Sequence, residues 1–174
     1  MSIYYQIPPQ SRMVNTSTIF SAVFNAVTPG RYDFTGTTAC QNVDVFKTIP
    51  GTMYLIERMN AGGNVSEDDF LSSIITFPLI ALRKKKSGES ILSGNVPVTN
   101  YFKGLETATW FYSDKQDDYL TLSLSGLFCQ TPAMVGLSPL QVQISMVIFA
   151  IESSYFNKFF RDQLRPSIGR GNVA

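Results

Sequence analysis

Two segments show the most regular alternation of apolar and polar residues in the chain. In residues 118–129, leucines alternate with Thr and Ser, the two-residue period of a strand that buries one face, at Leu120, Leu122 and Leu124. At Gly126 the apolar positions shift to Leu127 and Cys129. A glycine at such a shift is typical of a β-bulge or a twist, so we expect one long strand that bends there.

The second regular segment is residues 141–151. Its first half alternates Gln and Ser with the apolar residues Val142, Ile144 and Met146, whereas every position from Val147 to Ile151 is apolar. The pattern predicts a strand whose last part is covered on both faces.

Shorter segments with strand composition occupy residues 43–46, 52–59, 79–83 and 106–113. Residues 18–27 have apolar side chains at helical spacing but also several β-branched residues, so a helix and a strand both remain open there.

A short helix is predicted to begin at Ser66. Serine is a good N-cap, and the carboxylates that follow it favour the positive end of the helix dipole. Residues 70–83 are also consistent with a single strand, but Pro78 favours a break followed by a strand from Leu79.

Both ends of the chain differ from its middle. Residues 1–42 include Pro8, Pro9 and Pro29 among many hydroxyl residues, which predicts an extended arm. Residues 152–164 form an amphipathic helical pattern, and the basic tail after them is predicted to be extended.

These elements predict a mainly β fold, an antiparallel β-sandwich or barrel of the jelly-roll type. We expect an N-terminal arm over residues 1–42, the sandwich over residues 43–151, and a C-terminal helix with a basic tail over residues 152–174.

The composition indicates a neutral surface. Charged residues make up 16% of the 174 residues and aromatic residues 13%, with a net charge of +1. An average soluble protein has about 25% charged residues. Charge depletion and aromatic enrichment suit large permanent interfaces, although a β-rich protein without such interfaces is equally consistent with them.

Histidine is absent, which removes the commonest general base and every metal or haem site that needs imidazole. We therefore expect no enzyme, no cofactor and no metal. Cys40 and Cys129 are expected to be reduced and buried. We also expect no secretory signal and no transmembrane segment.

Charged clusters offer weak candidate sites. The basic run Arg83, Lys84, Lys85 and Lys86 is a candidate phosphate contact, but an exposed turn from Lys84 to Glu89 explains it more simply. The carboxylates of Asp114, Asp117 and Asp118 are better explained as solvated hairpin residues than as calcium ligands.

Aromatic residues form two groups. Tyr101, Trp110, Phe111 and Tyr112 are a candidate platform for a sugar or peptide, with Trp110 and Tyr112 on one face of a strand. The second group, with neighbouring arginines, supplies candidate assembly contacts at the termini: Tyr4, Tyr5, Tyr155, Phe156, Phe159, Phe160, Arg161 and Arg165.

A neutral, aromatic, β-rich body between two terminal arms resembles the single jelly-roll structural proteins of small icosahedral viruses, including capsid, penton and spike-base proteins of tailless bacteriophages. The resemblance covers residues 43–151. It implies an eight-stranded, two-sheet sandwich located in the virion, whose partners are copies of itself and other coat proteins.

The resemblance also implies no small-molecule substrate, and the basic tail is expected to contact anionic lipid or nucleic acid. The alternative function is a cytosolic β-sandwich module that binds a sugar or peptide through residues 101–112.

Overall fold

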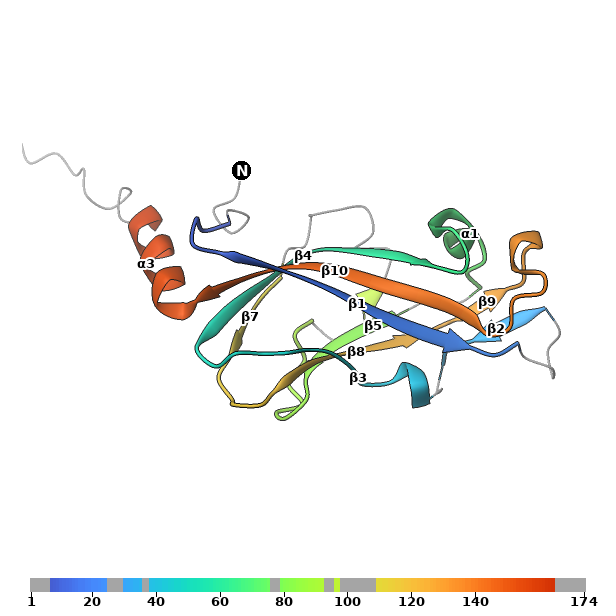
Figure 1. The fold of residues 1–174 in the computed structure, drawn as a ribbon, viewed down its shortest axis with the longest axis horizontal. Coiled ribbons are helices and arrows are strands. Elements are labelled where there is room, and N and C mark those ends of the chain that lie inside the picture. The colour runs from blue at the N-terminus through green and yellow to red at the C-terminus, as the bar shows by residue number, and fades with distance from the viewer. Residues whose placement is uncertain are drawn as a thin grey trace, which may run out of the picture.

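Two antiparallel four-stranded sheets face each other in the computed structural model, which describes residues 7–24, 30–35, 38–75, 79–92, 96–97 and 109–164 (Figure 1). The first, here the β1 sheet, has the strand order β1 (Arg12–Ala22), β10 (Leu140–Glu152), β4 (Thr52–Gly63) and β7 (Thr109–Ser113). The second, the β3 sheet, has the order β3 (Val43–Lys47), β8 (Tyr119–Ser125), β5 (Leu79–Lys84) and β6 (Val96–Pro97). The predicted mainly β, antiparallel, sandwich-like fold is confirmed.

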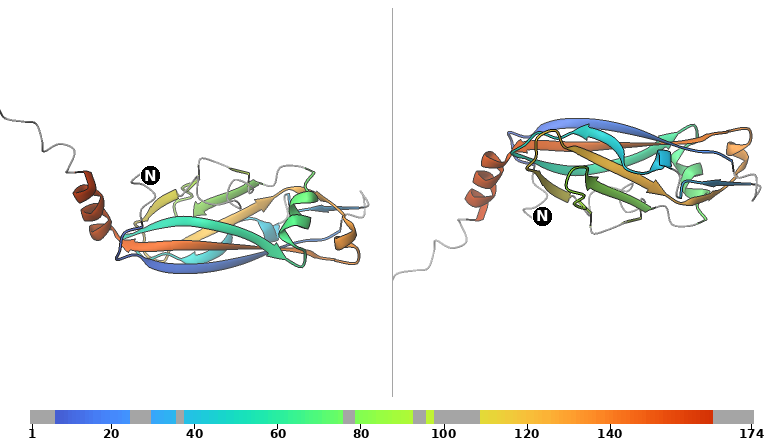
Figure 2. Two further views of the ribbon diagram at one scale, coloured as in Figure 1. Left: turned by 90° about the horizontal axis from the view of Figure 1, so that it is seen from above. Right: turned by 90° about the horizontal axis from the view of Figure 1, so that it is seen from below.

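Smaller elements complete the structure. Strands β2 (Arg31–Asp33) and β9 (Leu127–Cys129) form a separate ladder. The helices are η2 (Thr38–Cys40), α1 (Glu67–Ser72), η3 (Pro132–Met134) and α3 (Ser153–Leu164). Helix α3 projects beyond one end of the sandwich, called the α3 end below, and α1 lies near the other end (Figures 1 and 2).

The inward faces of the two sheets form one apolar core. Leu120, Leu122 and Leu124 of β8 are fully buried, as their alternation predicts. Large aromatic side chains fill much of the remaining space, and the ring of Tyr54 stacks on that of Phe111 with 5.1 Å between centroids. The space between the sheets is therefore packed with protein side chains.

Strand β4 changes the parity of its inward residues through a bulge. It buries Tyr54 and Ile56 first, then Met59. The register with β10 shifts between Val147 and Ile148, where Glu57 is the extra residue. The bulge keeps apolar side chains inward on both sides of it.

The predicted shift of the apolar face at Gly126 is wrong. Phe128 is fully buried, Leu127 is half-buried and Cys129 is exposed, so the inward positions keep the same parity. Gly126 itself takes an inward position with φ of 154°, a conformation that favours glycine. The chain leaves the β3 sheet there and pairs with β2 instead.

The prediction of an extended arm is wrong for residues 12–22, which form β1. This strand pairs with β10 from Arg12 opposite Ala150 to Ala22 opposite Leu140. For residues 18–27, the strand alternative is confirmed over residues 18–22, and the helix alternative is wrong for these residues. Polar residues such as Asn15 and Ser17 fit this strand because only its other face is buried.

The predicted helix start at Ser66 is confirmed. The Ser66 hydroxyl accepts a hydrogen bond from the Asp69 N–H at 3.1 Å, and α1 ends at Ser72. Strand β5 then begins at Leu79, as predicted, so the alternative of one strand over residues 70–83 is wrong.

Candidate interaction surface at the α3 end

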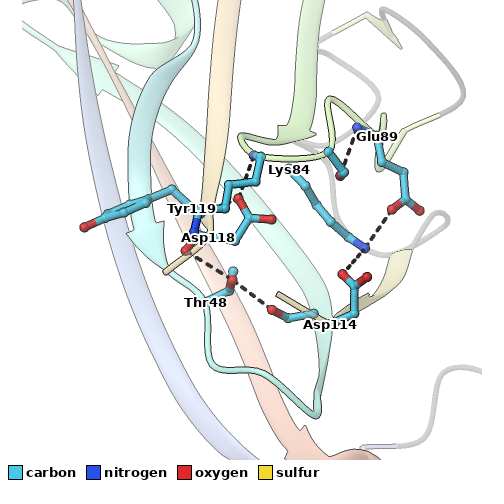
Figure 3. Close-up of polar contacts among 9 residues, drawn as sticks. Thr48, Lys84, Glu89, Asp114, Asp118 and Tyr119 are labelled. Carbon is cyan, nitrogen blue, oxygen red and sulfur yellow. Dashed lines mark hydrogen bonds and ion pairs between the residues drawn. The ribbon is translucent and has the colours of Figure 1, made fainter. Parts of the chain in front are cut away.

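Three turns meet at the α3 end and are joined by a polar network (Figure 3). They are the β3–β4 turn, the turn that follows β5, and the β7–β8 turn. Lys84, at the end of β5, is only 6% exposed, and its ammonium lies 2.7 Å from Glu89 and 3.6 Å from Asp114. A buried ammonium needs such partners, so these two carboxylates hold the turns together.

Asp118 is the most deeply buried acid of this network, at 1% exposure. Its carboxylate accepts hydrogen bonds from the backbone N–H groups of Lys86 and Tyr119, both at 2.8 Å. Its carbonyl accepts the N–H of Thr48 at 2.9 Å. The interpretation of Asp118 as a solvated hairpin residue is therefore wrong.

The basic run is divided among different acceptors. The ammonium of Lys85 lies 2.7 Å from Asp44, and that of Lys86 donates to the Gln116 carbonyl at 2.7 Å. Arg83 lies on the outward face of the β3 sheet, beside a small polar hollow with Asn42 and Ser123. These side chains do not converge, so the candidate phosphate contact gains no support, and the exposed-turn interpretation is wrong for Lys84.

Asp117 pairs with Lys47 across the same turns, and both side chains are exposed. The hydrogen bond and the charge of Lys47 lower the pKa of Asp117, and the same contact raises the pKa of Lys47. Asp117 thus binds the ammonium of Lys47, and Asp114 lies near that of Lys84. Among the described residues, no three His, Cys, Asp or Glu side chains are placed so that they could hold a metal ion.

The outward face of the β1 sheet carries a second apolar cluster near the α3 end. Leu55 and Ile151 are 1% and 3% exposed although they point away from the β3 sheet. Met53, Phe149 and Trp110 lie next to them in the paired strands and are half-buried. The predicted cover on both faces of residues 147–151 is therefore complete only at Ile151. On the outward face, Val147 and Phe149 are half-buried.

Helix α3 is packed against this cluster by its first turns. The ring of Phe156 meets that of Trp110 edge to face, with 4.8 Å between centroids. The preceding residue, Tyr155, is 48% exposed. The amphipathic helix predicted over residues 152–164 is confirmed as Ser153–Leu164, and part of its apolar side belongs to the domain.

The other candidate assembly contacts divide into two classes. Phe159 is half-buried within α3. The side chains of Phe160 and Arg161 lie outside the described residues, as do Tyr4, Tyr5 and Arg165 with the rest of the basic tail.

The candidate aromatic platform is only partly formed. Phe111 is buried in the core, and Trp110 and Tyr112 share the outward face, as their alternation predicts. Phe156 packs on Trp110, which restricts access to its ring, and Tyr101 lies outside the described residues. No feature of this strand favours a sugar-binding or peptide-binding platform.

A hollow of about 300 Å³ opens where β1 begins and β10 ends. Its lining combines the charged side chains of Arg12 and Glu152 with the apolar Ile49 and the exposed Tyr155. The mixture of opposite charges and apolar surface suits a protein segment better than a small anion.

Both cysteines are free. Cys40 is buried as expected, and burial raises the pKa of its thiol. Cys129 is exposed, which corrects the expectation of two buried thiols.

Sequence reasoning missed the buried roles of Lys84 and Asp118. Both occur in strongly polar stretches, where the pattern gives no signal of burial. Only the meeting of three turns from distant parts of the chain removes them from water.

No protein-family model and no curated protein matches the sequence. Within the described ranges, no helix combines the length and the apolar character that crossing a bilayer requires. The function must therefore be argued from the surfaces of the molecule itself.

Proposed function

We propose that this protein is a non-enzymatic structural subunit of a virus particle, of the single jelly-roll class. In this proposal it assembles with copies of itself or with other coat proteins through neutral, aromatic-rich surfaces. The proposal has two parts, the topology and the mode of assembly, which rest on different observations.

The strand pairing supports the jelly-roll topology. Apart from the short β2 and β9, the described residues form eight strands, and the first pairs with the last: β1 with β10. The second pairs with the seventh, the third with the sixth and the fourth with the fifth, as β3–β8, β4–β7 and β5–β6. A jelly roll has this nested order, because it is one long hairpin of four strand pairs wrapped into two sheets.

Jelly rolls serve many functions, so assembly must be argued from a surface. The outward face of the β1 sheet carries the argument. Its four strands contain only four charged residues, and its exposed side chains include Met13, Ile19 and Tyr112. Charge depletion with exposed aromatic and Met side chains is the composition of an interface core.

The exposed part of α3 extends this neutral surface beyond the sandwich. Tyr155 is half exposed beside the mixed hollow of Arg12 and Glu152, while Phe156 anchors the helix on the sheet. An anchored helix that presents an aromatic side chain suits docking on a neighbouring subunit. Anionic lipid or nucleic acid is proposed as a further partner of the basic tail, which includes Arg165.

The test is to determine the mass of the full chain in solution and its presence in particles purified from its natural source. We expect a symmetric oligomer by size-exclusion chromatography with light scattering, and the protein as a stoichiometric particle component. A chain that remains monomeric at high concentration and is absent from particles would overturn the proposal. Tyr155→Ala should weaken association, with Lys158→Ala as the matched control on the same helix.

A further inference from the structure

The four strands at the edges of the two described sheets differ in how well they are protected against pairing with another chain. Strand β3 has five residues, a register irregularity and the charged residues Asp44 and Lys47. Strand β6 has two residues, one of them Pro97. Strand β7 has five, and its Trp110 is contacted by Phe156 of α3. Short length, bulges, charges, proline and a covering helix all hinder edge-to-edge pairing.

Strand β1 has such a protection only near its last residues, where the short helix η2 contacts it. It is 11 residues long, contains no proline, and carries one charge, at its first residue, Arg12. Its register with β10 is uninterrupted, and it is the outermost strand of its sheet (Figure 2). Among the described residues no strand pairs with its other edge. A long, regular, uncharged edge is a template for another strand.

Two hydroxyl groups on the inward side of β1 lack a hydrogen-bond partner within the described part of the chain. They are the buried Oγ1 atoms of Thr16 and Thr18. A buried polar group left unpaired destabilises the state that contains it. Both residues lie next to Ser17, the middle residue of the strand.

We propose that β1 pairs antiparallel with β1 of a second copy, about a twofold axis at Ser17. Paired positions then add to 34, so Thr16 lies opposite Thr18 of the second copy and Thr18 opposite Thr16. Cross-strand Thr pairs form hydrogen bonds. Because both hydroxyls are buried within their own chain, each would reach its cross-strand Thr by rotation of the side chain. The even sum also keeps inward residues opposite inward residues, as continuation of the sheet requires.

The remaining pairs of this ladder are compatible with contact. Val14 faces Phe20 on the inward side, and Asn15 faces the exposed Ile19 on the outward side. No two like charges meet, since Arg12 lies opposite Ala22 at the margin. The ladder spans residues 14–20, because the Ser21 carbonyl already accepts the Cys40 thiol at 3.5 Å.

The result is a continuous sheet of eight strands across two subunits, four from each copy. The inference deepens the proposed function and rests on it, because it names the surface that joins two subunits. An isologous contact of this kind closes on itself, so it yields a dimer and not a filament.

The pairing is tested by charges at positions 15 and 19, which are exposed and face each other across the axis. The double variant Asn15→Lys with Ile19→Lys places lysine opposite lysine twice, and we expect it to be monomeric by light scattering. The double variant Asn15→Lys with Ile19→Glu places lysine opposite glutamate twice, and we expect twice the chain mass, as for the natural sequence.

Asn60→Lys is the matched control, because Asn60 is exposed on the same sheet face but belongs to an inner strand, β4. It should keep the natural mass. A Lys–Lys variant with the natural mass would overturn β1 pairing, and the persistence of an oligomer would leave the proposed function standing. A natural chain that is monomeric at every concentration would overturn β1 pairing, and its presence or absence in particles would then decide the proposed function.

A cross-link locates the axis. Both cross-linking variants also carry Cys129→Ser, which removes the exposed natural thiol. On mild oxidation, Ser17→Cys should form a disulfide-linked dimer, and Asn60→Cys should not. Equal cross-linking of the two variants would contradict an axis at Ser17.

Discussion

The two sheets of the sandwich are alike inside and different outside. The strands of the β1 sheet carry four charged residues, Arg12, Glu57, Arg58 and Glu152. At the α3 end of the β3 sheet, by contrast, Lys84, Lys85, Asp114 and Asp118 lie within one network of turns. One sheet thus has few charges on its outward face. The turns at the end of the other sheet are held together by ion pairs and hydrogen bonds between charged residues.

The difference separates two uses of polar residues. In the β3 sheet, the charged groups bind one another within the chain. The buried ammonium of Lys84 and the buried carboxylate of Asp118 hold the turns between the strands in place. In the β1 sheet, most outward side chains are uncharged, and Arg58 is the charged residue exposed on that face. That sheet is therefore the more suitable surface for the proposed assembly, whereas the end of the β3 sheet contributes more to the stability of the chain itself.

The largest predicted effect tests whether the two inward faces are equivalent. Leu122→Ala in the β3 sheet and Ile144→Ala in the β1 sheet should each lower the free energy of unfolding by about 2–5 kcal/mol, since both side chains are fully buried. Ser123→Ala, on the outward face, should lower it by about 1 kcal/mol through the lost contact with the Asn42 N–H. Chemical denaturation measures all three, and equal effects of Leu122→Ala and Ser123→Ala would contradict the assignment of faces.

The next effect concerns the charged end of the β3 sheet. Asp118→Ala removes the acceptor of two backbone N–H groups, those of Lys86 and Tyr119, and should lower the free energy of unfolding by about 2–4 kcal/mol. Asp114→Ala is the control, because Lys84 keeps the closer Glu89, and it should lower the free energy of unfolding by less than about 1 kcal/mol. If both variants unfold at the same denaturant concentration, burial of Asp118 is not what stabilises the turns.

The sequence predicts the strands best where one face alternates without interruption. Leu120 to Leu124 and Val142 to Met146 are buried as their pattern requires, because a period of two residues leaves little choice of face. The pattern misled at Gly126, where apolar Leu127 and Cys129 suggested a change of face. Phe128 points inward because its ring packs against Phe34 and Phe70, which are distant in the sequence.

The candidate surface was harder to predict than the fold. The length of β1 was hidden because Asn15, Ser17 and their neighbours resemble a polar arm, and an edge strand has only one apolar face to reveal it. The contact of Phe156 with Trp110 joins residues 46 positions apart and depends on where the last strand ends. Such contacts are set by topology, which a single sequence does not encode locally.

A smaller effect tests how firmly α3 belongs to the β1 sheet. Phe156→Ala should lower the free energy of unfolding by about 1 kcal/mol, because it removes the contact of the half-buried Phe156 ring with Trp110. The fluorescence emission of Trp110, the single tryptophan of the sequence, should shift to the red. Tyr155→Ala should leave both the emission and the free energy of unfolding nearly unchanged. An unchanged emission of Phe156→Ala would mean that α3 is an arm independent of the sheet.

The smallest effect is expected for the exposed ion pair of Lys47 with Asp117. The lowered pKa of Asp117 means that its contribution is present above the ordinary carboxyl pKa and is lost as the pH falls through the lowered value. The raised pKa of Lys47 means that its contribution is present below the ordinary lysine pKa and is lost as the pH rises through the raised value. Between about pH 5 and pH 9 the pair is therefore constant.

Asp117→Asn should accordingly leave the melting temperature almost unchanged across that pH range. Water and salt screen a pair whose side chains are 54% and 68% exposed, and asparagine tolerates the positive φ of 52° at this position. A melting curve at each pH, repeated in about 1 M salt, measures the effect. A large loss that disappears with salt would show that charges stabilise the β3 sheet end even where water reaches them, and the contrast with buried Asp118 would fail.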